Sequence, residues 1–245
     1  MIYQSLKDAQ NWLFSRTCLA CLDRVKTGKD FCPGCERSLP YLSNACQRCA
    51  AALTGPGENI CGQCQGEPPP FRRTLALFHY AEPVSRLIQD LKYHGQLHLA
   101  RMFGELLAER LSAHATLAQR ILPVPLRAGR LRERGYNQSL ELARPIARRL
   151  GLALDYRSLE RVRATAPQTE LPLAERARNV RKAFAMRGGF DGECVALNIA
   201  STQVEERGMV LAAGRAPDSM RTATPARIAD GYNDALRKRE PPFLM

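Results

Sequence analysis

Eight of the nine cysteines in this 245-residue sequence form four CxxC pairs within roughly its first quarter. The pairs are Cys18/Cys21, Cys32/Cys35, Cys46/Cys49 and Cys61/Cys64. A CxxC turn can place two thiolates on one metal ion, and two such turns complete a tetrahedral zinc site. The four pairs therefore predict two structural zinc ions, because a site of four cysteines leaves no coordination position for water or substrate. A redox-active CxxC is the alternative, and four copies without a thioredoxin-like context argue against it.

The spacing leaves open which pairs share an ion. The simplest assignment is tandem, with the first two pairs on one ion and the last two on the other. An interleaved pairing also satisfies a four-cysteine site. Segments this short bury little apolar surface, so we expect metal binding to supply the energy that folds them.

A second chemical signal is a run of arginines that follows the short apolar segment 121–124. The arginines are Arg127, Arg130, Arg132 and Arg134, and Gly135 ends the run. A buried strand, then a polar turn, then a helix is where α/β proteins present ligand-binding groups. Guanidinium groups bind phosphate well, and Asn137 and Gln138 lie at the helix start, where backbone N–H groups are available to an anion. The alternative is a solvated basic loop before a surface helix.

Composition limits the class of protein. Apolar residues make up 45% of the chain, which is enough for a packed core, and the formal charge is +12 with a pI near 9.6. This charge favours a polyanionic partner or a phosphorylated substrate. No apolar run has the length of a signal peptide or a membrane span, so we expect a cytoplasmic protein. In a reducing compartment the cysteines would not form a disulfide framework.

Hydrophobic periodicity predicts the elements that position these groups. The predicted elements are a strand over residues 74–80, helices over 84–93, 99–111 and 140–150, and a buried strand over 195–197. Pro145 lies inside the third helix and is expected to kink or divide it, and Gly151 ends it. Lys92 lies at the end of the first helix, where its charge also suits the helix dipole.

Together these motifs resemble the ComF/GntX family over roughly residues 15–197. The resemblance is carried by the four CxxC pairs and by three further segments. These segments are LIQDLKYHG (87–95), PVPL to RLRERGYNQ (123–138) and the pattern Q-x-x-L-x(4)-R-x-x-N-x(3)-AF (168–184). The resemblance implies an α/β protein with a double zinc ribbon at 15–66, a Pro-rich linker at 67–71 and a type I phosphoribosyltransferase-like domain at 72–197, built from a parallel sheet with flanking helices.

The family is linked to DNA uptake and natural transformation, with single-stranded DNA or phosphoribosyl pyrophosphate as ligands and competence proteins as possible partners. Its Arg-Gly-Phe/Tyr-Asn-Gln motif matches residues 134–138. Its loop glutamine matches Gln168, and its Arg/Asn pair matches Arg176 and Asn179. The resulting phosphate- or nucleic-acid-binding set is Lys92, Arg127, Arg130, Arg132, Arg134, Gly135, Tyr136, Asn137, Gln138, Gln168, Arg176 and Asn179.

The chain departs from the family pattern after Leu197. There the family has two adjacent acids, which hold ribose hydroxyls often through magnesium, and then a Thr-Thr-Gly phosphate loop. This chain instead has Asn198 and Ile199, and its next glycine is Gly208. Residues 212–225 show neither helical nor strand periodicity. We therefore expect a divergent tail over 198–245, incomplete or irregular, as a frameshift or a gene fusion would produce, and a sheet that lacks its last strands.

Three functions follow from these patterns. The first is a non-catalytic protein that binds single-stranded DNA through phosphates, with only Tyr93, Tyr136 and Tyr156 near the basic segments for base stacking. The second is an active phosphoribosyltransferase, which would require magnesium and phosphoribosyl pyrophosphate. The third is a degenerate member with a folded zinc ribbon and an unstable second domain.

Overall fold

A computed structural model gives the fold of the chain. It describes residues 17–25, 28–55, 57, 59–69, 73–112, 119–166, 171–172, 175, 178–179, 181–187, 194–199 and 210–215, the last two by their backbone. The helices are α2 (Pro33–Arg37), α3 (Gly62–Gly66), α4 (Val84–Tyr93), α5 (His98–Ser112), α6 (Ala128–Arg134) and α7 (Gln138–Leu150). The strands are β1 (Arg73–Ala76), β2 (Arg120–Pro123), β3 (Ala153–Leu154), β4 (Leu159–Arg161), β5 (Phe184–Met186), β6 (Cys194–Ile199) and β7 (Val210–Arg215).

Five strands form one mixed sheet in the order β1-β7-β6-β2-β3. Strand β2 pairs in parallel with β3 and β6, whereas β7 is antiparallel to both β6 and β1. Strands β4 and β5 form a separate antiparallel pair. The parallel part of the sheet brings the ends of β2, β3 and β6 to one edge, where the chain continues into the arginine run.

The prediction of an irregular tail is wrong for residues 210–215, which form β7. The sequence there, Val-Leu-Ala-Ala-Gly-Arg, does not alternate, and its small residues have weak strand propensity. Pairing with β6 on one side and β1 on the other makes it a strand, so tertiary context overrides the local signal. Strand β6 also extends to Ile199, beyond the predicted end. The remaining tail residues, 200–209 and 216–245, lie outside the described part of the chain.

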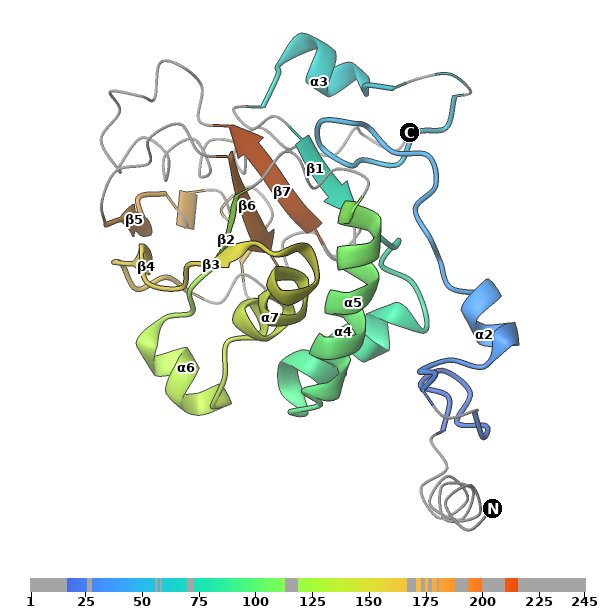
Figure 1. Ribbon diagram of the computed structural model, residues 1–245. Coiled ribbons are helices and arrows are strands. Elements are labelled where there is room, and N and C mark those ends of the chain that lie inside the picture. Colours follow the sequence, from blue (N-terminus) through green and yellow to red (C-terminus); the bar gives the residue numbers. More distant parts are fainter. Residues whose placement is uncertain are drawn as a thin grey trace.

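The three predicted amphipathic helices are confirmed as α4, α5 and α7, and Figure 1 shows them gathered beside the sheet. Helix α7 packs on β2, β3 and β6, and α5 packs on α7. Helix α7 is continuous through Pro145, so the expected division of the helix does not occur. The Pro145 ring instead lies against Gly104 of α5, where the absence of a side chain lets the two helices approach closely.

The main core includes part of the N-terminal segment that the sequence predicts to be a double zinc ribbon. Buried residues from the first ribbon, Cys18, Phe31 and Leu39, belong to the same hydrophobic cluster as the inner faces of α4, α5 and α7. The Arg86 guanidinium of α4 donates hydrogen bonds to the carbonyl oxygens of Leu19 and Ala20, each at 3.1 Å. The first ribbon is therefore packed against the helices that follow the linker.

Candidate metal centres and phosphate-binding surface

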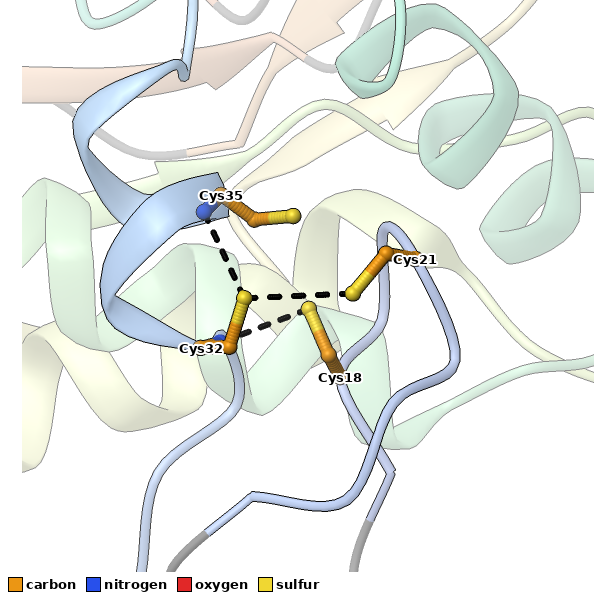
Figure 2. A group of neighbouring side chains, drawn as sticks. All are labelled: Cys18, Cys21, Cys32 and Cys35. Carbon is orange, nitrogen blue, oxygen red and sulfur yellow. Dashed lines mark hydrogen bonds between the residues drawn. The ribbon is translucent and has the colours of Figure 1, made fainter.

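The eight paired cysteines form two separate groups, each with its four sulfur atoms within 4.8 Å of one another. The first group is Cys18, Cys21, Cys32 and Cys35, and the second is Cys46, Cys49, Cys61 and Cys64. The tandem assignment is thus confirmed, and the interleaved one is wrong. Figure 2 shows the first group, whose side chains converge from a hairpin turn and from the start of α2. Among the described residues, these are the only groups of three or more His, Cys, Asp or Glu side chains that could hold a metal ion.

The two ribbons repeat the same backbone geometry. The residue after the first CxxC pair is in the left-handed region in each case, with Leu22 at φ 66° and Ala50 at φ 58°. The Leu22 N–H donates to the Cys18 carbonyl at 2.9 Å, and the Ala50 N–H donates to the Cys46 carbonyl at 2.8 Å. A left-handed residue is costly for an L-amino acid with a side chain, so this turn is one that the surrounding structure must impose. Convergence of four thiolates on one cation is a sufficient cause.

The sulfur atoms also receive hydrogen bonds that favour thiolates. The Cys32 N–H donates to Cys18 Sγ at 3.3 Å, and the Cys61 N–H donates to Cys46 Sγ at 3.3 Å. Burial raises the pKa of the Cys18 thiol, but these donated N–H groups lower it more, to about 6. The same balance lowers the pKa of Cys46 to about 7. One thiolate in each group therefore forms near neutral pH.

The thiols of Cys21, Cys35, Cys49 and Cys64 resist ionisation, because loss of hydration and neighbouring sulfur atoms raise their pKa. An Asp23 N–H lowers the pKa of Cys21, but loss of hydration and the neighbouring Cys18 thiol raise it to about 12. Burial raises the pKa of Cys49 and of Cys64. A dication would remove this repulsion and hold all four thiolates. The donor set, its closed geometry and its N–H···S bonds therefore fit two structural zinc ions.

The arginine run forms a short helix rather than the predicted turn. Residues 128–134 are α6, because Ala, Leu, Arg and Glu are all good helix formers and Arg130 Nη1 pairs with Glu133 Oε2 at 3.0 Å. Gly135 ends the helix in the left-handed conformation at φ 80°, with its N–H bonded to the Leu131 carbonyl at 2.8 Å. The role of Gly135 in the described structure is thus a helix C-cap.

The four arginines are not equivalent. Arg127, Arg130 and Arg132 are exposed, whereas Arg134 is partly buried. Arg130 and Arg134 are four residues apart and share a helix face, but Arg132 lies two residues from each and faces elsewhere. Burial lowers the pKa of Arg134, and the like charge of Arg130 lowers it further. Arg134 is therefore the one of the four whose guanidinium is partly shielded from water, and phosphate binding by it stays a prediction.

Helix α4 and the start of α7 hold Arg134 in position. Its Nη1 donates to the Gln138 Oε1 at 2.7 Å, and its guanidinium carbon lies 5.4 Å from the centre of the Tyr93 ring. The Tyr136 hydroxyl donates to the Leu91 carbonyl in the last turn of α4. Lys92, next in α4, is buried. The junction between α6 and α7 is therefore fastened to the end of α4.

Asn137 links the start of α7 to the loop after β2. Its Oδ1 accepts from the Ser139 N–H at 3.0 Å, and its Nδ2 donates to the Val124 carbonyl at 3.0 Å. Asn137 is therefore the N-cap of α7. The Ser139 N–H that it accepts from is one of the helix-start N–H groups predicted to be available to an anion. The amide thus positions the basic segment against the sheet edge.

The second predicted binding segment is only partly described. Asn179 uses both ends of its side chain on Ala166, since its Nδ2 donates to the carbonyl at 2.9 Å and its Oδ1 accepts from the N–H at 3.2 Å. These two hydrogen bonds join residue 179 to residue 166. Gln168 and Arg176 lie outside the described residues. Ligand binding by these three residues stays a prediction.

Tyr93 is a residue that the sequence places near the basic segments but that the predicted binding set leaves out. Tyr93 is 51% exposed, and its ring lies under the Arg134 guanidinium. The sequence signal that could have assigned Tyr93 to the site is its position at the end of a predicted helix, directly after Lys92. What the sequence could not reveal is that residue 93 meets residue 134.

Within the described residues, no helix combines the length and the apolar character needed to cross a membrane. The double zinc ribbon domain family matches residues 9–65. The chain is 35% identical over 160 residues to DNA utilization protein YhgH of Salmonella typhimurium, which is 63% of this chain and 70% of that protein. The YhgH protein of Escherichia coli K12 matches over the same shares at 36% identity.

Competence protein F of Haemophilus influenzae is 31% identical over 183 residues, which is 71% of this chain and 77% of that protein. The similarity therefore extends well beyond the zinc ribbon and includes the segment that carries Arg134. Relatives above 30% identity, matched over more than two thirds of their own length, show that the chain belongs to the ComF family.

Proposed function

We propose that this chain binds single-stranded DNA during DNA uptake, through phosphate contacts with α6 and the start of α7, and that it does so without catalysing a reaction. Competence proteins are the expected partners. The names of its relatives, DNA utilization protein and competence protein, support the process. The net charge of +12 supports a polyanionic ligand.

The observation that carries the proposal is the fixed, partly buried guanidinium of Arg134. Gln138 holds it on one side and the Tyr93 ring holds it on another. The junction follows the end of β2, at the edge where β3 and β6 also end, which is the usual ligand edge of a parallel sheet. An arginine held in place loses little conformational freedom when it binds a phosphate.

The end of β6 supports binding without catalysis. Asn198 pairs in register with Pro123, so residues 198 and 199 lie at this same edge. These are the positions at which the family pattern has its two acids. An amide and an aliphatic side chain cannot replace two carboxylates in holding ribose hydroxyls through magnesium. The chain thus keeps the arginine proposed to bind phosphate, Arg134, but lacks the acid pair.

The test is a titration of labelled oligothymidylate at several salt concentrations. A binding mode dominated by phosphates should lose about tenfold or more in affinity between about 50 and 200 mM salt. Arg134→Gln should weaken binding by about tenfold to hundredfold, because it removes a charge-assisted contact worth roughly 1.5–3 kcal/mol. An affinity that hardly changes with salt would contradict the proposal.

Arg149→Gln is the matched control. Arg149 is exposed in the last turn of α7, roughly 15 Å along the helix axis from Gln138, and the substitution removes the same charge. Its effect on affinity should be small. Equal losses for the two variants would mean that net charge, and not the α6–α7 junction, determines binding.

A phosphoribosyltransferase is the second candidate, with the segment 134–138 holding pyrophosphate. It is favoured by the position of this segment after the edge of three parallel strands. Calorimetry with phosphoribosyl pyrophosphate, with and without magnesium, distinguishes the two functions. Tight binding that depends on magnesium would favour the enzyme.

A further inference from the structure

Tyr93 presents an exposed aromatic ring at the phosphate-binding junction. It is the last residue of α4, between buried Lys92 and the capping residue His94. Tyr93 is 51% exposed and lies at helical spacing from exposed Arg86 and Gln89, so it belongs to the exposed face of α4. Its partner among the described contacts is the Arg134 guanidinium, at 5.4 Å from the ring centre.

The three tyrosines near the basic segments differ in their exposure and in their contacts. Tyr136 is partly buried, packs against the main core and uses its hydroxyl on Leu91, so its role is structural. Tyr156 is 52% exposed and lies 5.4 Å from the Arg157 guanidinium, but it follows β3 and is outside the arginine run. Tyr93 alone of the three is both exposed and in contact with Arg134.

The charges around Tyr93 suit a nucleic acid strand. The acids closest in sequence to the ring and to Arg134 are Asp90 and Glu133. Asp90 Oδ1 lies 2.8 Å from His94 Nδ1, and Glu133 pairs with Arg130. Both carboxylates thus have a cationic or hydrogen-bonding partner, which limits their repulsion of a phosphate.

We propose that the Tyr93 ring is a stacking platform for an unpaired nucleobase, while Arg134 binds the phosphate beside that base. This inference rests on the proposed function and adds a means of selecting single strands. Every base has a flat face that can stack, whereas in a duplex those faces are covered by neighbouring base pairs. The platform therefore favours single-stranded over double-stranded DNA without reading its sequence.

The experiment compares oligothymidylate with an abasic oligodeoxynucleotide of the same length, which has the same phosphates and no bases. The wild-type protein should bind the strand with bases about tenfold more tightly, which is the size of one stacking contact. Tyr93→Ala should reduce that affinity to the abasic level and leave binding of the abasic strand unchanged. Tyr93→Phe, which keeps the ring, should behave as the wild type.

Leu97→Ala is the matched control, because Leu97 is 44% exposed and lies four residues beyond Tyr93 but has no ring. It should change neither affinity. A second measurement uses Tyr93→Trp, whose fluorescence should fall when oligothymidylate is added and stay constant with the abasic strand. Wild-type fluorescence corrects for Trp12, the one tryptophan of the sequence.

The outcomes separate the two proposals. Equal wild-type affinity for both strands overturns the stacking platform and leaves phosphate binding intact. Loss of abasic-strand binding in Tyr93→Ala overturns it as well, because the ring would then act only by positioning Arg134. If the wild-type protein binds neither strand, the proposed function fails and the platform fails with it.

Discussion

Asp155 is the residue at which side-chain chemistry most clearly shapes the sheet edge. It follows β3 directly, and its carboxylate accepts hydrogen bonds from the Ser158 hydroxyl at 2.7 Å and from the N–H groups of Arg157 and Ser158. Its Oδ2 also lies 3.1 Å from Arg120 Nη1 at the start of β2. Burial raises the pKa of Asp155, but these partners lower it more, and the net pKa is below its ordinary 3.8.

The sign of this shift predicts how Asp155→Asn depends on pH. A carboxyl group with a lowered pKa stabilises the fold above about pH 4, and the contribution is lost as the pH falls through the pKa of the folded state. Asp155→Asn should therefore cost about 1–3 kcal/mol at pH 7, with a difference that shrinks at pH 3. Urea unfolding of both proteins measures it.

Any loss of zinc on acidification affects the wild-type protein and Asp155→Asn alike, so it cancels in the difference between their free energies of unfolding. Glu109→Gln is the control, because Glu109 is exposed on α5. It should change stability little at either pH. A difference for Asp155→Asn that stays constant from pH 7 to pH 3 would show that the charge of Asp155 does not contribute.

At the scale of elements, the contact between α5 and α7 sets the helical layer on which the site rests. Gly104 of α5 faces Pro145 and the Leu142 carbonyl of α7. A Cβ at position 104 would lie 2.8 Å from the Leu142 oxygen and would overlap the Pro145 ring. The start of α7 carries Asn137 and Gln138, so a shift of α7 would move the groups that hold Arg134.

Gly104→Ala should therefore destabilise the protein by about 1–3 kcal/mol, the usual cost of overpacking a well-filled core. This is opposite in sign to the small gain expected for Gly to Ala within a helix. Gly62→Ala in α3 is the control, because a Cβ there meets nothing within 4 Å. Thermal unfolding of the two variants checks the prediction, and similar midpoints would contradict the close packing of α5 on α7.

At the scale of the whole molecule, the two cysteine groups differ in what surrounds them. Cys18 of the first group lies in the main core, and Arg86 and Arg101 connect α4 and α5 to the first ribbon. The second group forms a small cluster of its own with nearby ribbon residues. The Leu91 carbonyl, in the last turn of α4, also accepts a hydrogen bond from the Tyr136 hydroxyl. The first group is therefore the one connected, through α4, to the α6–α7 junction.

Loss of zinc from the first group should loosen α4 and α5. Cys32→Ser should accelerate hydrogen exchange of their amides by more than about tenfold, because disrupting core packing costs about 2–5 kcal/mol. Cys61→Ser, the matched change in the second group, should act mainly on the second ribbon. Hydrogen exchange measured by mass spectrometry separates the two effects.

Equal exchange in α4 and α5 for the two variants would show that the first ribbon does not brace the core. Limited proteolysis gives a second readout. If cleavage near residues 67–71 released an intact ribbon and destroyed the rest in the wild-type protein, the view of an unstable second domain would be favoured instead.

The elements predicted well are those whose signal is local. Valine, leucine and isoleucine at helical spacing predicted α4, α5 and α7, and Gly151 ends α7 as expected, at φ 66°. The elements predicted poorly depend on partners. Strand β7 has weak propensity and exists by pairing on both edges. Helix α6 is short, contains Gly129 and has no apolar periodicity, so its pattern predicts a basic turn. Helix α7 is not divided at Pro145, whose ring lies against Gly104 of α5.

The sequence by itself determined the number and type of metal ligands, because CxxC spacing is a local property of the backbone, and it identified the arginine run and the missing acid pair. Only the tertiary structure decided which cysteine pairs share an ion, which arginine is held in place, and that Tyr93 lies against Arg134. Those contacts join residues distant in the chain, and they arise from packing α4 against the start of α7, which no local pattern encodes.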